Sequence, residues 1–310
     1  MKIAYLILAH DDPQKLKRLI MSLQTRNAYF FIHIDKKVEL SPFQTYCSDM
    51  KNVRFIKNRV KVNWGGYSMC IAERELIRDS LSDSVKYDRF ILLSGLDYPI
   101  WPNSKIETDF INNPKKEYMK AYNLSIIKTP RKIPQRIKTY HFRDILLPNK
   151  TLNRLVIGAL MRIMNVLPIK KDVYIKDGKM KYSVWGGSQW WILTRDCVKY
   201  ILHEMDVNKK LCNYFRTSLA PDELFLQTIV FNSPFKANAL FLDEDGVYPG
   251  LEKTTYTHYI EYKGNQKVFT DKDFSNLVNS GKMFCRKTRS GVSDKLMDML
   301  DAYRNEKTDC

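Results

Sequence analysis

Residues 3–9 read Ile-Ala-Tyr-Leu-Ile-Leu-Ala, and the polar stretch His10-Asp11-Asp12-Pro13 follows directly. Seven consecutive apolar residues with polar neighbours are typical of a strand that is buried on both faces. Pro13 suits the first turn of a helix. The apolar residues after it recur at helical spacing, namely Leu16, Leu19, Ile20 and Leu23. A buried strand that leads at once into an amphipathic helix is typical of an α/β fold with parallel strands.

The same alternation continues along the first hundred residues. Strands are predicted at 29–34, 53–56 and 89–94, and a helix at 68–81 with Ser68 as its cap. We therefore expect a mostly parallel, Rossmann-like sheet flanked by helices. Ligands bind beyond the carboxyl ends of the strands in such sheets. Three segments follow those ends: His10, Asp35–Lys37 and Gly95–Asp97.

The 310 residues predict one domain with three parts. These are a nucleotide-binding half (1–114), a basic helical insertion (115–181) and an acceptor-binding and catalytic half (182–310). The insertion holds 17 Lys and Arg and four acids, so it carries +13 of the total formal charge of +17. Such a charge favours a polyanionic or anionic-membrane partner. Nucleic acid is not expected, because no recognised binding motif accompanies the charge.

A helix is predicted at 152–168 within the basic insertion. Its apolar residues form one stripe, and the basic residues lie off it: Lys150, Arg154, Arg162, Lys170 and Lys171. Two interpretations stay open. We favour a core-packed helix with a solvated basic face, and the other is a helix that rests on anionic lipid at a membrane surface.

The cysteines and the N-terminus indicate the compartment. None of the six cysteines forms a Cys-x-x-Cys pair, so neither a zinc site nor a small disulfide framework is indicated. The apolar run 3–9 is too short for a membrane span and lacks a cleavage site. We expect mostly buried thiols and a cytoplasmic protein, with the inner face of the plasma membrane as an option.

No metal or cofactor motif stands out. The Asp-x-Asp triplets at 243–245 and 271–273 are about as many as chance gives, and they suit a turn and a helix start. The strand end that would carry a metal-binding pair, 94–98, has a single carboxylate, Asp97. Neither a P-loop nor a dinucleotide fingerprint occurs. We therefore expect no metal ion and no cofactor.

Two short charged segments have possible chemistry. Pro221 precedes Asp222 and Glu223 in the first turn of a predicted helix. Helix capping needs only one carboxylate, and Asp222 supplies it. Glu223 is therefore not needed for that role and suits a general base. Arg286 and Lys287 are either surface charges or the fixed cations that a diphosphate needs when no metal is present.

Eight segments resemble, in order, the core-2/I-branching N-acetylglucosaminyltransferases, glycosyltransferase family 14, which also contains the peptide xylosyltransferases. The segments are 7–13, 31–37, 52–56, 62–68, 91–100, 187–194, 221–228 and 284–287. The resemblance implies a GT-A-type fold, a UDP-sugar as co-substrate and transfer with inversion and without a metal ion.

The resemblance also implies roles for individual residues. Glu223 matches the catalytic glutamate, which deprotonates the acceptor hydroxyl. Segments that resemble the donor side hold His10, Asp35, Trp64, Arg286 and Lys287. The segment near the acceptor and the donor sugar holds Ser188, Gln189 and Trp190, and we place Asp97 with them.

One departure from the family concerns the diphosphate. The animal branching enzymes carry a second phosphate-binding arginine in an interval that is too short here, between Tyr262 and Asp273. Arg286, Lys263 or Lys267 are the candidates to replace it. The animal enzymes also carry a membrane anchor and lumenal disulfides, which this sequence does not show, so we expect a bacterial relative.

The expected reaction therefore moves a sugar, first of all N-acetylglucosamine, from UDP to a hydroxyl of a glycan in bacterial surface polysaccharide synthesis. The acceptor includes lipid-linked glycans as an option. Xylose, glucose and glucuronate are alternative donor sugars. A rival function from another class is a non-catalytic protein that binds a polysaccharide or nucleic acid.

Overall fold

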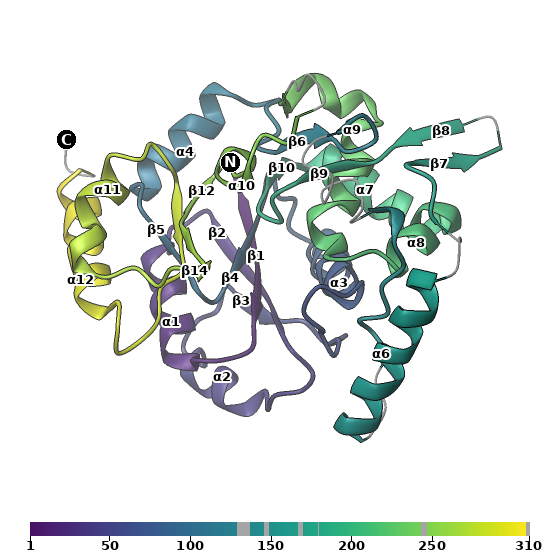
Figure 1. Ribbon diagram of the computed structural model, residues 1–310. Coiled ribbons are helices and arrows are strands. Elements are labelled where there is room, and N and C mark those ends of the chain that lie inside the picture. The colour runs from purple at the N-terminus through teal and green to yellow at the C-terminus, as the bar shows by residue number, and fades with distance from the viewer. Residues whose placement is uncertain (129–136, 146–148, 167–169, 179, 243–246, 308–310) are drawn as a thin grey trace.

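A five-stranded sheet forms the centre of the computed structural model, which describes residues 1–128, 137–145, 149–166, 170–178, 180–242 and 247–307 (Figure 1). The strand order is β10-β4-β1-β2-β3. Four strands are parallel: β1 (Ile3–Ala9), β2 (Ala28–Ile34), β3 (Val53–Phe55) and β4 (Arg89–Ser94). The edge strand β10 (Ile192–Thr194) is antiparallel to β4. The predicted α/β class with a mostly parallel sheet is confirmed.

Helices cover both faces of this sheet (Figure 1). One face packs against α1 (Pro13–Ser22), α2 (Ser41–Tyr46), α4 (Asn103–Asn112), α11 (Phe274–Val278) and α12 (Asp294–Glu306). The other packs against α3 (Ser68–Leu81), α7 (Arg195–Val207), α8 (Lys209–Arg216) and α9 (Phe225–Phe231). Strand β1 supplies both cores, because its odd-numbered residues face the first set of helices and its even-numbered residues the second. Each large apolar side chain buried in this way contributes roughly 1.5–3 kcal/mol.

Two smaller sheets connect the halves of the chain. One has the order β11-β6-β9, with β6 (Lys120–Asn123), β9 (Trp185–Gly187) and β11 (Leu240–Phe241). The other has the order β12-β15-β5, with β5 (Asp97–Pro99), β12 (His258–Ile260) and β15 (Phe284–Arg286). Strand β6 lies in the predicted insertion, so the start of that segment belongs to the main body. Pairing of β15 with β5 brings Arg286 opposite Asp97.

The remaining elements are short. They are the hairpins β7 (Tyr174–Asp177)–β8 (Met180–Ser183) and β13 (Tyr262–Lys263)–β14 (Asn265–Gln266), the helix α10 (Leu251–Thr254), and the 3-10 turns η1 (Pro221–Glu223), η2 (Pro234–Asn238) and η3 (Asp271–Asp273).

The predicted basic helix is present as α6 (Lys150–Val166), but our favoured interpretation of it is wrong. No side chain that the structure describes on α6 is buried, so the helix is not core-packed. In Figure 1, α6 extends away from the body at the lower right. The exposed fraction reaches 85% at Val166. Residues 167 and 168 of the predicted helix lie outside the described ranges.

The location of Lys171 also differs from the prediction, which placed it on a solvated basic surface. Its side chain is buried, and its Nζ donates hydrogen bonds to Ser218 Oγ (2.7 Å) and to the carbonyl oxygen of Tyr214 (2.5 Å). Burial lowers the pKa of Lys171 to about 7. Lys171 therefore supports α8 from within the protein.

Two predicted helix caps are not caps. Helix α3 begins at Ser68 itself, whose hydroxyl donates to Asp144 Oδ1 (2.6 Å) instead of capping the helix. The helix predicted to open at Pro221 is a 3-10 turn, and α9 begins only at Phe225. The N-cap positions of these two elements are held by Ala220 and Leu224, not by Asp222.

Five of the six cysteines are buried and unpaired, as expected; Cys310 lies outside the described ranges. Within those ranges, none of the helices combines the length and the apolar character that crossing a membrane requires.

Candidate active site

A cleft of about 530 Å³, counting the space open at its mouth, lies at the carboxyl edge of the parallel strands. Its walls come from the segments that follow β1, β2 and β4, from the β9–β10 connection and from the end of β15. Among its lining residues are five of the predicted site residues: His10, Asp35, Gln189, Trp190 and Arg286. The fold thus brings together side chains that are up to 276 positions apart in the sequence.

Asp35 is held rigidly at the end of β2. The guanidinium of Arg59 donates to the carbonyl oxygens of Ile34 and Asp35, each at 2.9 Å. One carboxylate oxygen of Asp35 accepts a hydrogen bond from the backbone N–H of Lys37 (2.9 Å), while the other lies 3.5 Å from Lys37 Nζ. A fixed, mostly buried carboxylate at a strand end suits recognition of an N–H donor on a ligand.

Arg286 is fixed between a buried carboxylate and an indole ring. Asp97 is completely buried and accepts hydrogen bonds from Arg286 Nη1 (2.8 Å), Ser94 N (2.7 Å) and His258 Nε2 (3.3 Å). Burial alone would raise the pKa of Asp97, but Arg286 and His258 outweigh it and hold that pKa well below its usual range. The guanidinium lies 4.6 Å from the centroid of the Trp190 ring.

This network changes the role expected for Asp97. We expected Asp97 to contact the acceptor or the sugar, but the structure buries its carboxylate and occupies it with protein donors. Asp97 instead orients Arg286, which does line the cleft.

Two further cations follow Arg286 in the sequence; neither is among the lining residues of the cleft, but both lie near Asp11, which is. Lys287 is half-buried, and burial, followed by the nearby charges of Arg286 and Arg289, lowers its pKa. Arg289 Nη1 lies 3.9 Å from Asp11 Oδ2, and 45% of the Arg289 side chain is exposed. The sequence interpretation missed Arg289, although its place two residues after the basic pair was a signal.

Among the candidates for the second phosphate contact whose side chains the structure describes, Arg286 lines the cleft and Lys267 does not. Lys267 is engaged by Glu261 (3.1 Å) and by Asp273. The side chain of Lys263 lies outside the described part of the chain.

Glu223 lies in a strained turn that is docked on the Trp64–Gly65–Gly66 loop. Ala220 has a left-handed backbone (φ 46°), and its N–H donates to the carbonyl oxygen of Gly65 (3.0 Å). Glu223 is half-buried, and Trp64 is 78% exposed. Neither residue lines the cleft itself; both belong to this adjoining pair of loops.

The backbone at Gly66 lies so close to Asp144 of the basic insertion that a side chain at this position would collide with it. A Cβ at this position would lie 2.3 Å from Asp144 Oδ1. The carboxylate of Asp144 accepts hydrogen bonds from Ser68 N (2.9 Å) and from Asn63 Nδ2 (3.2 Å). Part of the basic insertion therefore closes directly over the loop that carries Trp64.

The residues of the segment 188–190 differ in burial and in their hydrogen-bond partners. Ser188 is almost fully buried, and its carbonyl oxygen accepts from Gln227 Nε2 (2.6 Å). Gln189 lines the cleft, and its Nε2 donates to Glu73 Oε1 (2.8 Å). The sequence interpretation missed Glu73; its signal was a single acid on the otherwise apolar face of the predicted helix 68–81.

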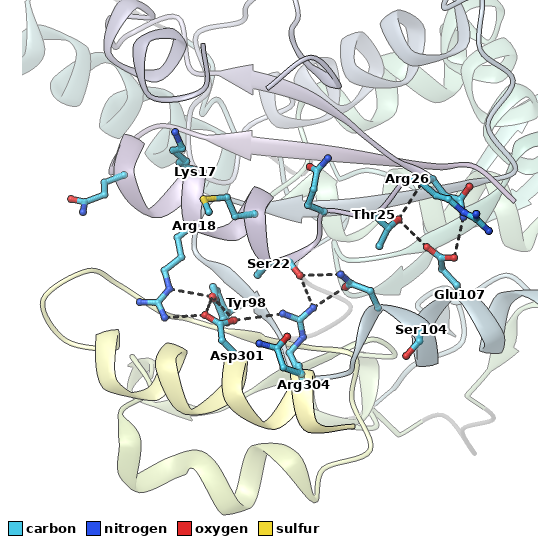
Figure 2. Close-up of a pocket in the computed structure, with 16 residues that line it drawn as sticks. Lys17, Arg18, Ser22, Thr25, Arg26, Tyr98, Ser104, Glu107, Asp301 and Arg304 are labelled. Carbon is cyan, nitrogen blue, oxygen red and sulfur yellow. Dashed lines mark hydrogen bonds and ion pairs between the residues drawn. The ribbon is translucent and has the colours of Figure 1, made fainter. Parts of the chain in front are cut away.

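A larger groove of about 1640 Å³, counted in the same way, lies along α1 between α12 and α4 and reaches the residues that precede β2 (Figure 2). In Figure 2, Arg18, Tyr98 and Asp301 point toward one another. Arg18 Nη2 donates to Asp301 Oδ2 (3.0 Å), and Arg304 Nη2 donates to the carbonyl oxygen of Ser22 (2.6 Å). These bonds fasten α12 to α1, so the groove is a seam between helices.

The Asp-x-Asp triplets do not form a metal site in the described ranges. Asp271 pairs with Lys295 (2.7 Å), and Asp273 caps η3 through a capping box with Thr270, which confirms the predicted helix start. The triplet 243–245 lies outside those ranges. In the part of the chain that the structure covers, no three His, Cys, Asp or Glu side chains come together as metal ligands.

Comparison with known proteins identifies the family. A family model described as Core-2/I-Branching enzyme matches residues 3–245. Xylosyltransferase 2 of Mus musculus is 26% identical over 322 residues, which covers 97% of this chain and 33% of that protein. Xylosyltransferase 1 of Rattus norvegicus is 24% identical over 314 residues, which covers 97% and 35%. The chain thus spans about a third of the length of these relatives.

Among solved structures, 4-diphosphocytidyl-2C-methyl-D-erythritol synthase from Anaerococcus prevotii matches with a TM-score of 0.38 and 8% identity, over 79% of this chain and 88% of that one. So weak a likeness carries no argument about the site. The family model, in contrast, covers well over half of the chain, including every segment around the cleft up to Trp190. The chain belongs to the core-2/I-branching enzyme family, glycosyltransferase family 14.

Proposed function

We propose that this chain is an inverting glycosyltransferase that uses a UDP-sugar, without a metal ion, to glycosylate a hydroxyl of a glycan acceptor. The observation that carries the proposal is the fixed guanidinium of Arg286 at the carboxyl edge of the sheet. Its Nη1 is bound by Asp97, while its Nε is buried and has no hydrogen-bond partner within the described chain. A buried N–H of an arginine that the protein leaves unpaired is a strong donor for an anionic ligand.

The nucleotide occupies the cleft between β1 and β2. Asp35 accepts a hydrogen bond from the uracil N3–H, and His10 lies beside the nucleotide. Support comes from the rigid placement of Asp35 by Arg59 and from the position of both residues at strand ends.

The diphosphate lies against the cation cluster, defined as Arg286, Lys287 and Arg289. Fixed cations stabilise the negative charge that develops on UDP as the bond to the sugar breaks, which is the role a divalent ion has in other transferases. Because Asp97 and Trp190 already hold Arg286, little reorganisation is needed when the diphosphate binds.

Glu223 acts as the general base. It accepts the proton of the acceptor hydroxyl while that oxygen forms a bond to the anomeric carbon. The bond from that carbon to the UDP oxygen breaks on the opposite face, and its electron pair leaves with the diphosphate. Attack and departure on opposite faces invert the configuration. The strained Ala220 before the turn supports this role, because backbone strain is concentrated at functional sites.

N-acetylglucosamine is the donor sugar that we propose first. Xylose is the leading alternative, because the curated relatives named above are xylosyltransferases, and glucose and glucuronate remain further options. A comparison of UDP-N-acetylglucosamine, UDP-xylose, UDP-glucose and UDP-glucuronate as substrates, each in EDTA, decides among them.

We also propose a peripheral contact with anionic membrane through α6, where a lipid-linked glycan of bacterial surface polysaccharide synthesis would be the acceptor. Exposed apolar residues recur at intervals of three or four along one face of α6: Leu152, Leu155, Ala159, Ile163 and Val166. The helix contains no acid, and Arg154 and Arg162 are exposed beside this apolar face. Apolar and cationic side chains together suit an anionic lipid surface, whereas two copies of such a helix repel each other.

Vesicle binding tests the membrane contact. We expect the chain to sediment with phosphatidylglycerol vesicles, and the double variant Leu155→Asp/Ile163→Asp to lose this binding while keeping turnover of a soluble acceptor. The matched control is Met21→Asp/Val292→Asp, which changes two apolar residues that are equally exposed on other elements. Equal loss in both variants, or no binding by the unmodified chain, contradicts the contact.

Transfer activity tests the central proposal and separates it from a non-catalytic binding protein. We expect turnover of a UDP-sugar in EDTA, lost in Glu223→Gln while UDP affinity is retained. UDP binding without turnover of any donor, and with no effect of Glu223→Gln, would instead favour a binding protein.

A further inference from the structure

Glu73 is a buried acid behind the wall of the cleft. It lies on the face of α3 that packs against the sheet, and its side chain is completely buried among apolar neighbours such as Ala72, Leu76 and Ile77. Burying a carboxyl group costs free energy that an apolar residue at the same place would not. A leucine would continue this face of the helix, so packing alone does not explain the glutamate.

The two carboxyl oxygens of Glu73 differ in their surroundings. Oε1 accepts the hydrogen bond from Gln189 Nε2 at 2.8 Å. Oε2 is buried and makes no hydrogen bond of usual distance and angle in the described part of the chain, although Trp191 lies close enough to oppose the rise in the pKa of Glu73. Burial, and then the nearby charge of Asp222, raise the pKa of Glu73 well above its usual value, although the bond from Gln189 opposes them. Burial therefore favours the protonated, uncharged form of Glu73 behind the cleft.

Gln189 connects Glu73 with the cleft. Its side chain lines the cleft beside Trp190 and Arg286. A carboxamide has an N–H side and a carbonyl side, and the bond to Glu73 uses the N–H side. The carbonyl oxygen of Gln189 is then the group available to accept a hydrogen bond from a ligand in the cleft.

Glu73 also lies near the turn that carries the proposed base. The charge of Asp222, the residue before Glu223, acts on Glu73. Helix α3, which carries Glu73, also packs against η1, which carries Glu223. A ligand group that contacts both Gln189 and Glu223 lies at the junction of the donor cleft and the catalytic turn, where the transferred sugar must be.

We propose that Glu73 is a positioning residue for the donor sugar, which orients the Gln189 carboxamide so that its Oε1 accepts a hydrogen bond from a hydroxyl or an amide N–H of that sugar. The inference rests on the proposed function, because it assigns the sugar of the UDP-sugar to this part of the cleft. Glu73 itself does not touch the ligand.

Binding and kinetics with UDP and with UDP-sugars test this role. The variant Glu73→Leu removes the acceptor for Gln189, and we expect it to lower the affinity for UDP-N-acetylglucosamine or UDP-xylose, whichever the unmodified chain uses, about tenfold. UDP affinity should change less than about twofold, since UDP lacks the sugar. Glu73→Gln keeps an oxygen that accepts the bond and should restore most of the sugar affinity.

A double-mutant cycle and a control separate positioning from general damage. In a Gln189→Ala background, Glu73→Leu should have no further effect on sugar affinity. Glu75→Leu is the matched control, because Glu75 is also a buried acid on α3 but pairs with Arg74 and Arg78. It should leave sugar affinity unchanged. Glu73→Met replaces the leucine variant if that one does not fold.

The outcomes separate this inference from the proposed function. Unchanged sugar affinity in Glu73→Leu, an equal loss of UDP affinity, or an undiminished effect in the Gln189→Ala background overturns the positioning role while the glycosyltransferase proposal stands. Failure of the unmodified chain to bind UDP and every UDP-sugar overturns both.

Discussion

The cleft at the carboxyl edge of the sheet and the groove along α1 differ in how the protein satisfies their charged side chains. In the larger groove, both arginines donate hydrogen bonds to the protein itself (Figure 2). Arg18 donates to Asp301, and Arg304 donates to two backbone carbonyl oxygens and to the side chain of Asn103. In the smaller cleft, Arg286 keeps a buried Nε without a partner in the part of the chain described. A buried hydrogen-bond donor that the protein leaves unpaired is typical of a ligand-binding site. A contact between helices, in contrast, normally pairs its donors within the protein.

The difference predicts where substitutions affect activity and where they affect stability. Residues of the cleft are expected to act on binding and turnover, and residues of the groove on the docking of α12.

The largest effect is expected for Glu223→Gln. Loss of the general base should lower kcat by about 10³-fold, within the usual range for such groups, while UDP affinity and the free energy of unfolding stay close to those of the unmodified chain. Steady-state kinetics with the best donor measures kcat, and urea unfolding measures stability. Retained kcat would mean that another group takes the proton.

The next effect is expected for Arg286→Gln. Removing the fixed guanidinium should lower kcat/KM for the UDP-sugar about 100-fold, because the diphosphate loses its charge-assisted hydrogen bonds. The fold should persist, since Asp97 keeps its bonds from Ser94 and His258. Kinetic measurement in EDTA gives kcat/KM, and a change smaller than twofold would place the diphosphate elsewhere.

Arg304→Gln is the counterpart in the groove. Arg304 is almost fully buried and donates to the carbonyl oxygens of Trp101 (2.9 Å) and Ser22 (2.6 Å). Leaving such acceptors unpaired should lower the free energy of unfolding by about 3 kcal/mol, with kcat/KM unchanged. Urea unfolding and kinetics on the same preparation check both. A loss of activity without a loss of stability would reverse the contrast between cleft and groove.

A smaller effect is expected on the pH dependence of stability, through His33, which lines the cleft as Asp35 does. Burial lowers the pKa of His33 to about 4, from an ordinary value of 6.5, even though the charge of Asp35 opposes this. Between these two pH values the unfolded chain binds a proton that the folded chain does not. The stability that the neutral His33 contributes is therefore present above pH 6.5 and declines as the pH falls, by roughly 2 kcal/mol at about pH 5.

The variant His33→Gln isolates this contribution. His33 Nε2 accepts the backbone N–H of Val60 (2.9 Å), and a glutamine oxygen can accept the same bond without titrating. Urea unfolding of both proteins at several pH values should show a shallower decline for the variant. Parallel curves would show that His33 does not contribute.

The sequence predicted the central sheet well because β1 is an unbroken apolar run and β2 and β4 are mostly apolar. Their carboxyl ends also predicted where the cleft lies, since the geometry of a parallel sheet brings His10 and Asp35 to one edge. Local patterns sufficed wherever the deciding contacts are between neighbours along the chain.

The partnership of Asp97 with Arg286 could not be predicted in this way. It depends on the pairing of β5 with β15, which are nearly 190 residues apart, and no local pattern specifies that pairing. Ser68 was misjudged for a similar reason, because Asp144 from a distant segment binds the hydroxyl that capping would have used. The exposure of α6 was missed because an apolar stripe looks the same whether protein or another surface covers it.

Calorimetric titration with UDP in EDTA tests the central claim most directly: that protein cations, led by Arg286, bind the diphosphate. We predict that the unmodified chain and Arg304→Gln bind UDP equally, that added Mg²⁺ or Mn²⁺ leaves the affinity unchanged, and that Arg286→Gln binds at least about tenfold more weakly. Binding that requires the metal ion, or equal affinity in Arg286→Gln, would contradict the account.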